Sequence, residues 1–279
     1  GRNSPEYVRP QRPRHSQTCP GTLQPTTTER TGEGIEIAYG FSFNGRHCSE
    51  FGLVMRSKNR QLLPEPNDRY VQVPGRQGAI LFPRELGDRH IDIDCAFVEK
   101  NLSDLRVRVR EIAAWLHTTD RAMLSFDDEP GKYYRGKLLL SVDFSHLSTM
   151  GEFNLTFVCE PLAYGNQVTN SFTNDAVTVA NTGTVSAMPI IEATFTDTAT
   201  EFKVTKGTEF IKVVHAFKLN DVLKIDTGTG AILINGQRAM DKLDWQNSRF
   251  FSLAVGANTL SITPTGKCTA TVKHVPRWL

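Results

Sequence analysis

The chain has 279 residues, a hydrophobic content of 39% and a formal net charge of +2. This length exceeds what one small core usually needs, so two domains are expected. The near-neutral charge gives no argument for nucleic acid or an anionic membrane as partner, and no apolar run approaches the roughly 18 residues of a membrane span. Five cysteines, an odd number at wide spacing, fit reduced thiols in a protein made in a cytoplasm.

Residues 1–39 differ from the rest of the chain. They contain five prolines and almost no large apolar residues. Such a segment cannot bury enough surface to offset the entropic cost of ordering it. We therefore expect a flexible extension, a processed end or a remnant of cloning over residues 1–39.

Residues 40–165 are predicted to form the first domain. Strand patterns occur at 41–48, at 51–56, at 70–82 as a hairpin around residues 75–77, and at 88–98. A further alternating strand at 152–160 closes the domain. Cys95 and Cys159 each continue an alternating apolar series, so both are expected to be small core residues.

A change of hydrophobic period after residue 100 predicts one helix. The apolar stripe, with spacings of four, three and four, consists of Leu105, Val109, Ile112 and Leu116. Ser103 is the expected N-cap, and Trp115 is expected to extend the buried side. Three basic residues lie off this stripe and form a possible basic face, although a solvated surface is the more ordinary interpretation: Arg106, Arg108 and Arg110.

An acidic turn follows the helix, with the sequence Asp127, Asp128 and Glu129. Clustered carboxylates can share protons or bind a hard cation. Pro130 and Gly131 mark a turn here, however, and neighbouring side chains of a strand point to opposite faces. The chain also lacks a P-loop, a dinucleotide fingerprint and a His-Glu-x-x-His motif. We expect no catalytic residue, no metal site and no cofactor.

Residues 166–279 are predicted to form the second domain. Short strand patterns with Thr, Gly and Asn turns fill almost all of this segment, which is typical of a β-sandwich. Within it, Asp226, Thr227 and Gly228 spell the active-site tripeptide of aspartic proteases. Such a protease needs two Asp carboxylates that share a proton, and no second copy of the tripeptide occurs in the chain. Apolar strand patterns on both sides favour a hairpin turn instead.

Several short motifs, in order along residues 40–279, resemble the family of siphophage distal tail proteins (Dit). Among them are Phe41-Ser42-Phe43-Asn44-Gly45 and the Val73-Pro74-Gly75-Arg76-Gln77-Gly78 hairpin. The others lie at 50–54, 115–116, 127–134, 159–161, 225–236, 248–253, 256–259 and 277–279. The resemblance rests on their order and spacing, because each motif alone is short.

The resemblance implies a mainly β fold. The first domain would be a sandwich-like belt with a hairpin and one α-helix, and the second a galectin-like or carbohydrate-binding-module-like β-sandwich. It implies a structural, non-enzymatic hub at the virion tail tip, in which a homohexameric ring joins the tail tube protein to tail-tip, tail-associated hub or baseplate proteins. The tape-measure protein and DNA would pass through the lumen without specific binding, and receptor-binding proteins are further candidate partners.

A second interpretation is a host-glycan-binding adhesion module carried by the C-terminal sandwich. Sugar sites commonly stack a ring on an exposed aromatic side chain. Trp245 and Tyr164 are the candidate glycan contacts, and either could instead belong to a core or a domain contact.

Overall fold

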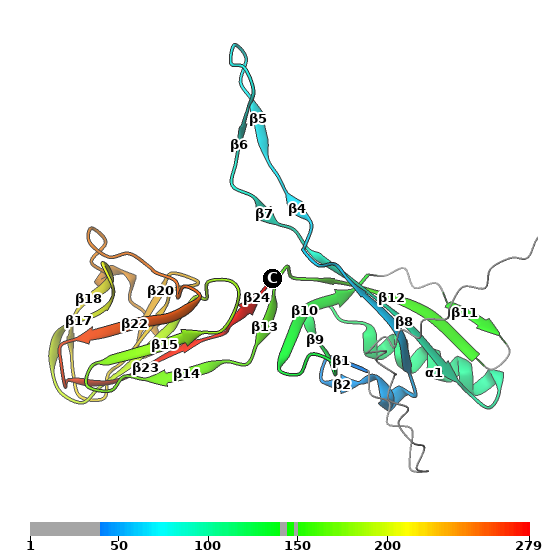
Figure 1. The fold of residues 1–279 in the computed structure, drawn as a ribbon. Coiled ribbons are helices and arrows are strands. Elements are labelled where there is room, and N and C mark those ends of the chain that lie inside the picture. Colours follow the sequence, from blue (N-terminus) through cyan, green and yellow to red (C-terminus); the bar gives the residue numbers. More distant parts are fainter. Residues whose placement is uncertain (1–39, 140–143, 148–149) are drawn as a thin grey trace, which may run out of the picture. The chain divides into compact units, whose positions relative to one another are not determined.

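The computed structural model describes residues 40–139, 144–147 and 150–279 (Figure 1). The extension predicted over residues 1–39 lies outside them. The described chain is mainly β with one α-helix, as predicted. None of its helices is long and apolar enough to cross a membrane.

The first sheet has ten strands and the order β2-β1-β9-β10-β12-β8-β3, with β11 paired to β12 and β13 paired to β10 and β24. Its strands are β1 (Phe41–Phe43), β2 (Arg46–His47), β3 (Val54–Arg60), β8 (Arg89–Val98), β9 (Ala122–Phe126), β10 (Lys132–Leu138), β11 (Phe144–Leu147), β12 (Met150–Cys159), β13 (Ala163–Gly165) and β24 (Arg277–Trp278). All pairs are antiparallel, and β8 and β12 form its longest ladder, from Arg89–Cys159 to Val98–Met150. Sequence-distant strands therefore lie side by side.

The first core lies on one face of this sheet. Because strand residues alternate between faces, Ile91, Ile93 and Cys95 of β8 point to the same side as Leu155 and Phe157 of β12. These side chains are buried together with the apolar side of α1 (Leu102–Leu116) and with the 3-10 helix η1 (Cys48–Phe51). The core positions predicted for Cys95 and Cys159 are confirmed. Burial raises the pKa of each of these thiols to about 12.

Helix α1 begins earlier than predicted. Its N-cap is Asn101, whose side chain accepts a hydrogen bond of 2.9 Å from the backbone N–H of Asp104. The prediction of Ser103 was therefore wrong by two residues. The predicted burial of Trp115 is confirmed: its indole N–H donates to the carbonyl oxygen of Phe43 at 2.9 Å.

The segment predicted as one strand over 41–48 is instead a tight hairpin of β1 and β2. Asn44 and Gly45 have positive φ angles of 50° and 78°, the conformation that a two-residue turn requires. The chain then forms η1 before β3 begins at Val54, so the predicted strand at 51–56 starts three residues too early.

The hairpin predicted over 70–82 is confirmed, and it is part of a longer two-stranded element. Residues 61–87, called the arm below, contain the pair β4 (Pro66–Asn67) and β7 (Glu85–Leu86) and the pair β5 (Tyr70–Gln72) and β6 (Ala79–Leu81). No described element covers it: all residues from Glu65 to Leu86 are exposed (Figure 1).

The second core is shared by two antiparallel sheets. A six-stranded sheet has the order β14-β23-β16-β19-β20-β21, and a four-stranded sheet has the order β15-β22-β17-β18. The first contains β14 (Val168–Ser171), β16 (Ile190–Phe195), β19 (Val222–Asp226), β20 (Ala231–Ile234), β21 (Gln237–Arg238) and β23 (Cys268–His274). The second contains β15 (Ala176–Asn181), β17 (Ala199–Lys206), β18 (Glu209–Phe217) and β22 (Gly256–Thr263), and the 3-10 helix η2 (Met240–Lys242) follows β21.

Side chains from both sheets meet in this core, as Phe195 of β16 does with Phe202 of β17 and Phe217 of β18. The second half thus contains two sheets that share one core, and its likeness to a galectin or a carbohydrate-binding module stays a prediction. The buried residues of the first core fall between Phe41 and Ala163, and those of the second between Val179 and Val272. The boundary expected after residue 165 stays a prediction.

Candidate functional site

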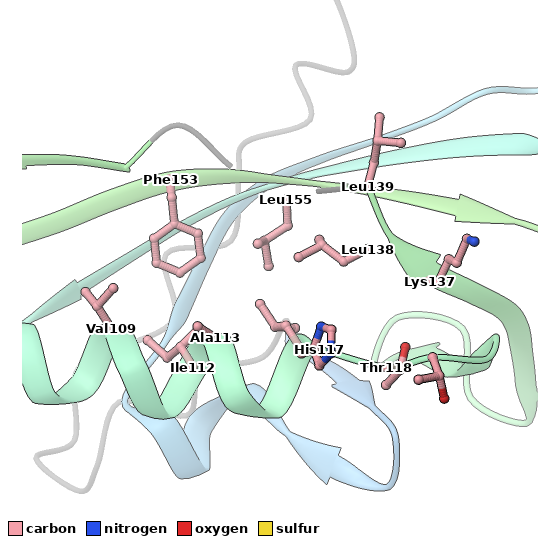
Figure 2. Close-up of a pocket in the computed structure, with 12 residues that line it drawn as sticks. Val109, Ile112, Ala113, His117, Thr118, Lys137, Leu138, Leu139, Phe153 and Leu155 are labelled. Atoms are coloured by element: carbon pink, nitrogen blue, oxygen red, sulfur yellow. The ribbon is translucent and has the colours of Figure 1, made fainter. Parts of the chain in front are cut away.

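An apolar groove lies between α1 and the strands β10 and β12, with a volume of about 830 Å³ (Figure 2). We call it the α1 groove. Its apolar lining includes Val109, Ile112 and Leu116 of the helix, and Leu138, Phe153 and Leu155 of the sheet. In Figure 2 the three sheet residues reach toward the helix.

The sequence builds this groove by two periodicities. Val109, Ile112 and Leu116 recur at helical spacing and therefore share one side of α1. Phe153 and Leu155 are two residues apart in β12, so they share one face of the sheet. His117 and Lys137 also line the groove. With mostly apolar walls, it suits binding of apolar side chains better than acid–base catalysis.

The acidic turn after β9 is engaged in ion pairs. Asp128 pairs with Lys58, and Glu129 pairs with Arg60 and, at 2.9 Å, with Lys132. Burial raises the pKa of Asp128, but the hydrogen bond and charge of Lys58 outweigh it and lower the pKa below its usual range. For Glu129, Lys132 and Arg60 outweigh burial in the same way. These carboxylates stay ionised and tie the turn to β3. In the described chain, no group of three or more His, Cys, Asp or Glu residues could hold a metal ion.

The Asp-Thr-Gly tripeptide forms a hairpin turn, as predicted. Asp226 ends β19, and its Oδ1 accepts hydrogen bonds from the backbone N–H groups of Gly228 at 2.9 Å and Thr229 at 3.2 Å. The Thr227 hydroxyl is buried and donates to the carbonyl oxygen of Pro189 at 2.8 Å. The carboxylate therefore caps its own turn.

The two candidate glycan contacts belong to different parts of the fold. Trp245 follows η2 and is 61% exposed, which leaves its ring available for stacking. Tyr164, in β13 of the ten-stranded sheet, is half-buried and stacks on Tyr133 with a ring separation of 5.8 Å. Its hydroxyl donates to Glu160 at 2.5 Å. Burial and this hydrogen bond raise the pKa of Tyr164 to about 12. The role in glycan binding stays a prediction for both.

The three arginines of the predicted basic face lie on α1 in different surroundings. Arg106 and Arg110 are exposed and one helical turn apart. Arg108 is half-buried and pairs with Glu99 at 3.0 Å and Glu111 at 2.8 Å. Positions two apart differ by about 200° around a helix, so Arg108 projects away from the other two. The basic face stays a prediction. Arg106 and Arg110 fit it better than Arg108, whose charge is paired with Glu99 and Glu111.

Sequence reasoning missed both the α1 groove and the exposure of the arm. The apolar stripe of α1 was assigned wholly to the core, although its end faces a cavity. A signal for the arm was present in the printed sequence. In Tyr70-Val71 and Ile80-Leu81-Phe82 the apolar residues are consecutive, whereas a half-buried strand alternates. Consecutive apolar residues in a two-stranded hairpin give it two apolar faces.

Comparison with known proteins identifies the family. The family model described as "Phage tail protein RIFT-related domain" matches residues 46–159, and the one described as "Siphovirus-type tail component, C-terminal domain" matches residues 182–278. The distal tail protein of Bacillus phage SPP1 is 26% identical over 222 residues, which cover 76% of this chain and 87% of that protein.

The crystal structure of SPP1 Dit has the same fold. It superimposes with a TM-score of 0.73 at 22% identity and covers 86% of this chain and 99% of that one. Both family domains occur here in the same chain, and the relative matches across both of them. The chain therefore belongs to the siphophage distal tail protein (Dit) family and is a phage tail component.

Proposed function

We propose that the chain forms a homohexameric ring at the virion tail tip and acts there as a structural hub. One face of the ring would dock on the tail tube protein and the other on tail-associated hub, baseplate or receptor-binding proteins. The tape-measure protein and DNA would pass through its lumen. Assembly would take place in the cytoplasm of the host bacterium, and no step of this role requires catalysis.

The observation that carries this proposal is the match to SPP1 Dit across both halves of the chain. SPP1 Dit is described as a paradigm of the hub adsorption apparatus of phages that infect Gram-positive bacteria. A ring also suits the fold. The described sheets are open, with β2 and β3 at the ends of the first sheet order. Closed contacts between identical subunits can cover such edges without open-ended growth.

Mass photometry and negative-stain imaging of the purified full chain test the ring. Six copies of 31.1 kDa would give a particle of about 187 kDa with sixfold symmetry. A strict monomer at every protein concentration, also when the tail tube protein is added, would refute the proposal.

A second candidate function is recognition of host glycan by the C-terminal half. The exposed Trp245 favours it, because an exposed indole is a common sugar-stacking platform. The test is a glycan array with the full chain, followed by calorimetry on any hit. Binding should be lost in Trp245→Ala and kept in Val255→Ala, which changes another exposed apolar residue. No binding on the array, or equal binding by both variants, would end this candidate.

A further inference from the structure

The arm is anchored at its root by a buried arginine. Arg89 is only 4% exposed, and its guanidinium donates to the carbonyl oxygen of Gln61 at 3.1 Å and to that of Pro161 at 3.2 Å. The side-chain oxygen of Gln61 accepts from the backbone N–H of His90 at 3.3 Å. These bonds tie the first residue of the arm to β8 and to the end of β12. The root of the arm is therefore held by part-buried hydrogen bonds.

The arm also balances its own charge. It carries three acidic and three basic residues. Arg84 makes two hydrogen bonds to Asp68, at 2.8 and 2.9 Å, and Arg69 lies 3.6 Å from Glu85. An element with no net charge has no net electrostatic repulsion from an identical subunit, and its binding does not depend on a partner of opposite charge. It suits an apolar binding partner.

Both faces of the arm are apolar and uncovered. Tyr70 and Leu81 are cross-strand partners, so they share one face, and they are 68% and 70% exposed. Val71 and Ile80 are partners on the other face and are also exposed. A two-stranded hairpin that packs against nothing is marginal in water. The exposed segment from Glu65 to Leu86 comprises 22 residues, which is the number that one side of a stable protein interface uses, about 20–30.

The same chain carries a second uncovered apolar surface, the α1 groove. The α1 groove, of about 830 Å³, is lined mostly by aliphatic and aromatic side chains, with His117 and Lys137 among its polar residues, and the part of the chain that the structure describes does not fill it. The arm and the groove are different surfaces of one polypeptide. A contact between two different surfaces of identical subunits is heterologous, and repeated with the right rotation it closes a ring.

We propose that the arm of each subunit docks into the α1 groove of the next copy of this chain, with Tyr70 and Leu81 as its anchoring side chains. This proposal rests on the ring of the proposed function and names the contact that closes it. Arg89 is then a positioning residue, because it fixes the root of the arm without touching the neighbouring subunit.

Removal of the anchors tests the arm. Tyr70→Ser combined with Leu81→Ser should raise the subunit concentration for half-assembly at least tenfold, measured by mass photometry. The matched control is Leu219→Ser combined with Val255→Ser, two exposed apolar residues outside the arm, which should assemble like the wild type. All four side chains are exposed, so both variants should keep the circular dichroism and the Tm of the wild type.

Cross-linking tests the groove as receptor. Leu81→Cys combined with Val109→Cys, under mild oxidation, should give a ladder of covalent multimers up to hexamer on non-reducing gels. Either single variant and the wild type should give none. If the wild type and the anchor variant form rings at the same subunit concentration and the cysteine variant gives no ladder, this inference is overturned while the proposed function stands. Loss of rings in the anchor variant without a ladder would refute the groove as the receptor and indicate another partner surface. A wild type that never forms rings would refute the proposed function, and the inference with it.

Discussion

Trp115 should be the most sensitive single position of the first core. Its buried indole stacks on Phe51, with ring centroids 4.3 Å apart and an interplanar angle of 16°, and on Phe41 at 5.8 Å and 20°. Its N–H donates to the carbonyl oxygen of Phe43 at 2.9 Å. The side chain thus joins α1 to η1 and β1 at one point, and its removal affects all three elements.

The expected magnitude follows from these contacts. Replacement of a buried Trp by Ala usually costs about 3–5 kcal/mol of unfolding free energy. Each stacked aromatic pair adds about 0.5–1.5 kcal/mol, and a buried acceptor left without its donor costs about 1–3 kcal/mol. Trp115→Ala should therefore lie near the top of the range, at about 4–5 kcal/mol. Trp115→Phe keeps a stacking ring but no N–H, so it should lose about 1–3 kcal/mol.

Urea unfolding followed by far-ultraviolet circular dichroism measures both losses. The matched control is Trp245→Ala, because Trp245 is 61% exposed and should change the unfolding free energy by no more than about 0.5 kcal/mol. The two cores can unfold in separate transitions, in which case the loss should appear only in the transition that involves α1. A loss below about 1 kcal/mol for Trp115→Ala, or one equal to that of Trp245→Ala, would refute this account of the core.

Three further predictions concern other parts of the chain. Gly136→Ala should cost about 1–3 kcal/mol, because a Cβ at this position would overlap Sγ of Cys159, and Cys159→Ala should recover part of that loss in a double-mutant cycle; strictly additive losses would contradict the contact. Burial lowers the pKa of His274 below its usual 6.5, so the unfolded chain takes up a proton first and stability should fall as the pH drops below about 6.5. Between pH 8 and pH 5 the Tm of His274→Gln should therefore fall less than the Tm of the wild type. Equal changes in Tm for the two proteins would refute this prediction. Asp226→Asn should leave stability within about 0.5 kcal/mol and ring formation unchanged, because an Asn oxygen can accept the same turn hydrogen bonds; a peptidase activity of the wild type that the variant lacks would contradict the turn interpretation.

Local periodicity was sufficient to predict several elements. The alternation over 88–98 located β8, which the structure has at Arg89–Val98, and the apolar spacing from Leu105 to Leu116 located α1. Boundaries were harder. Asn101 and Ser103 are both good N-cap residues. In the structure Asn101 is extended, with φ of −151°, so the helix begins directly after it. This conformation depends on where the chain leaves β8. That constraint is tertiary, so spacing alone could not reveal it.

Pairing and cavities were beyond the reach of local pattern. The strand β8 lies between β12 and β3, and along the chain β12 follows β8 only after the helix and three further strands of the same sheet, β9, β10 and β11. Nothing in the sequence of β8 names these partners. The α1 groove likewise lies between side chains of α1 and side chains of β10 and β12, which are far apart in the sequence. Its width depends on the separation of helix and sheet, a quantity that no single segment encodes.

Two hairpins of this chain show what local pattern can say about function. In the hairpin after Asp226, the cross-strand pairs Leu223–Ile234 and Ile225–Ile232 are buried on one face, and Lys224 points the other way. This hairpin has one apolar face, and that face is buried in the core of its own subunit. In the arm, both Tyr70–Leu81 and Val71–Ile80 are apolar, although they point to opposite faces. A hairpin that is apolar on both faces cannot bury those faces while it projects into solvent from its own subunit. Burial of these apolar faces requires a second surface, and for a subunit of a ring that surface can belong to an identical neighbour.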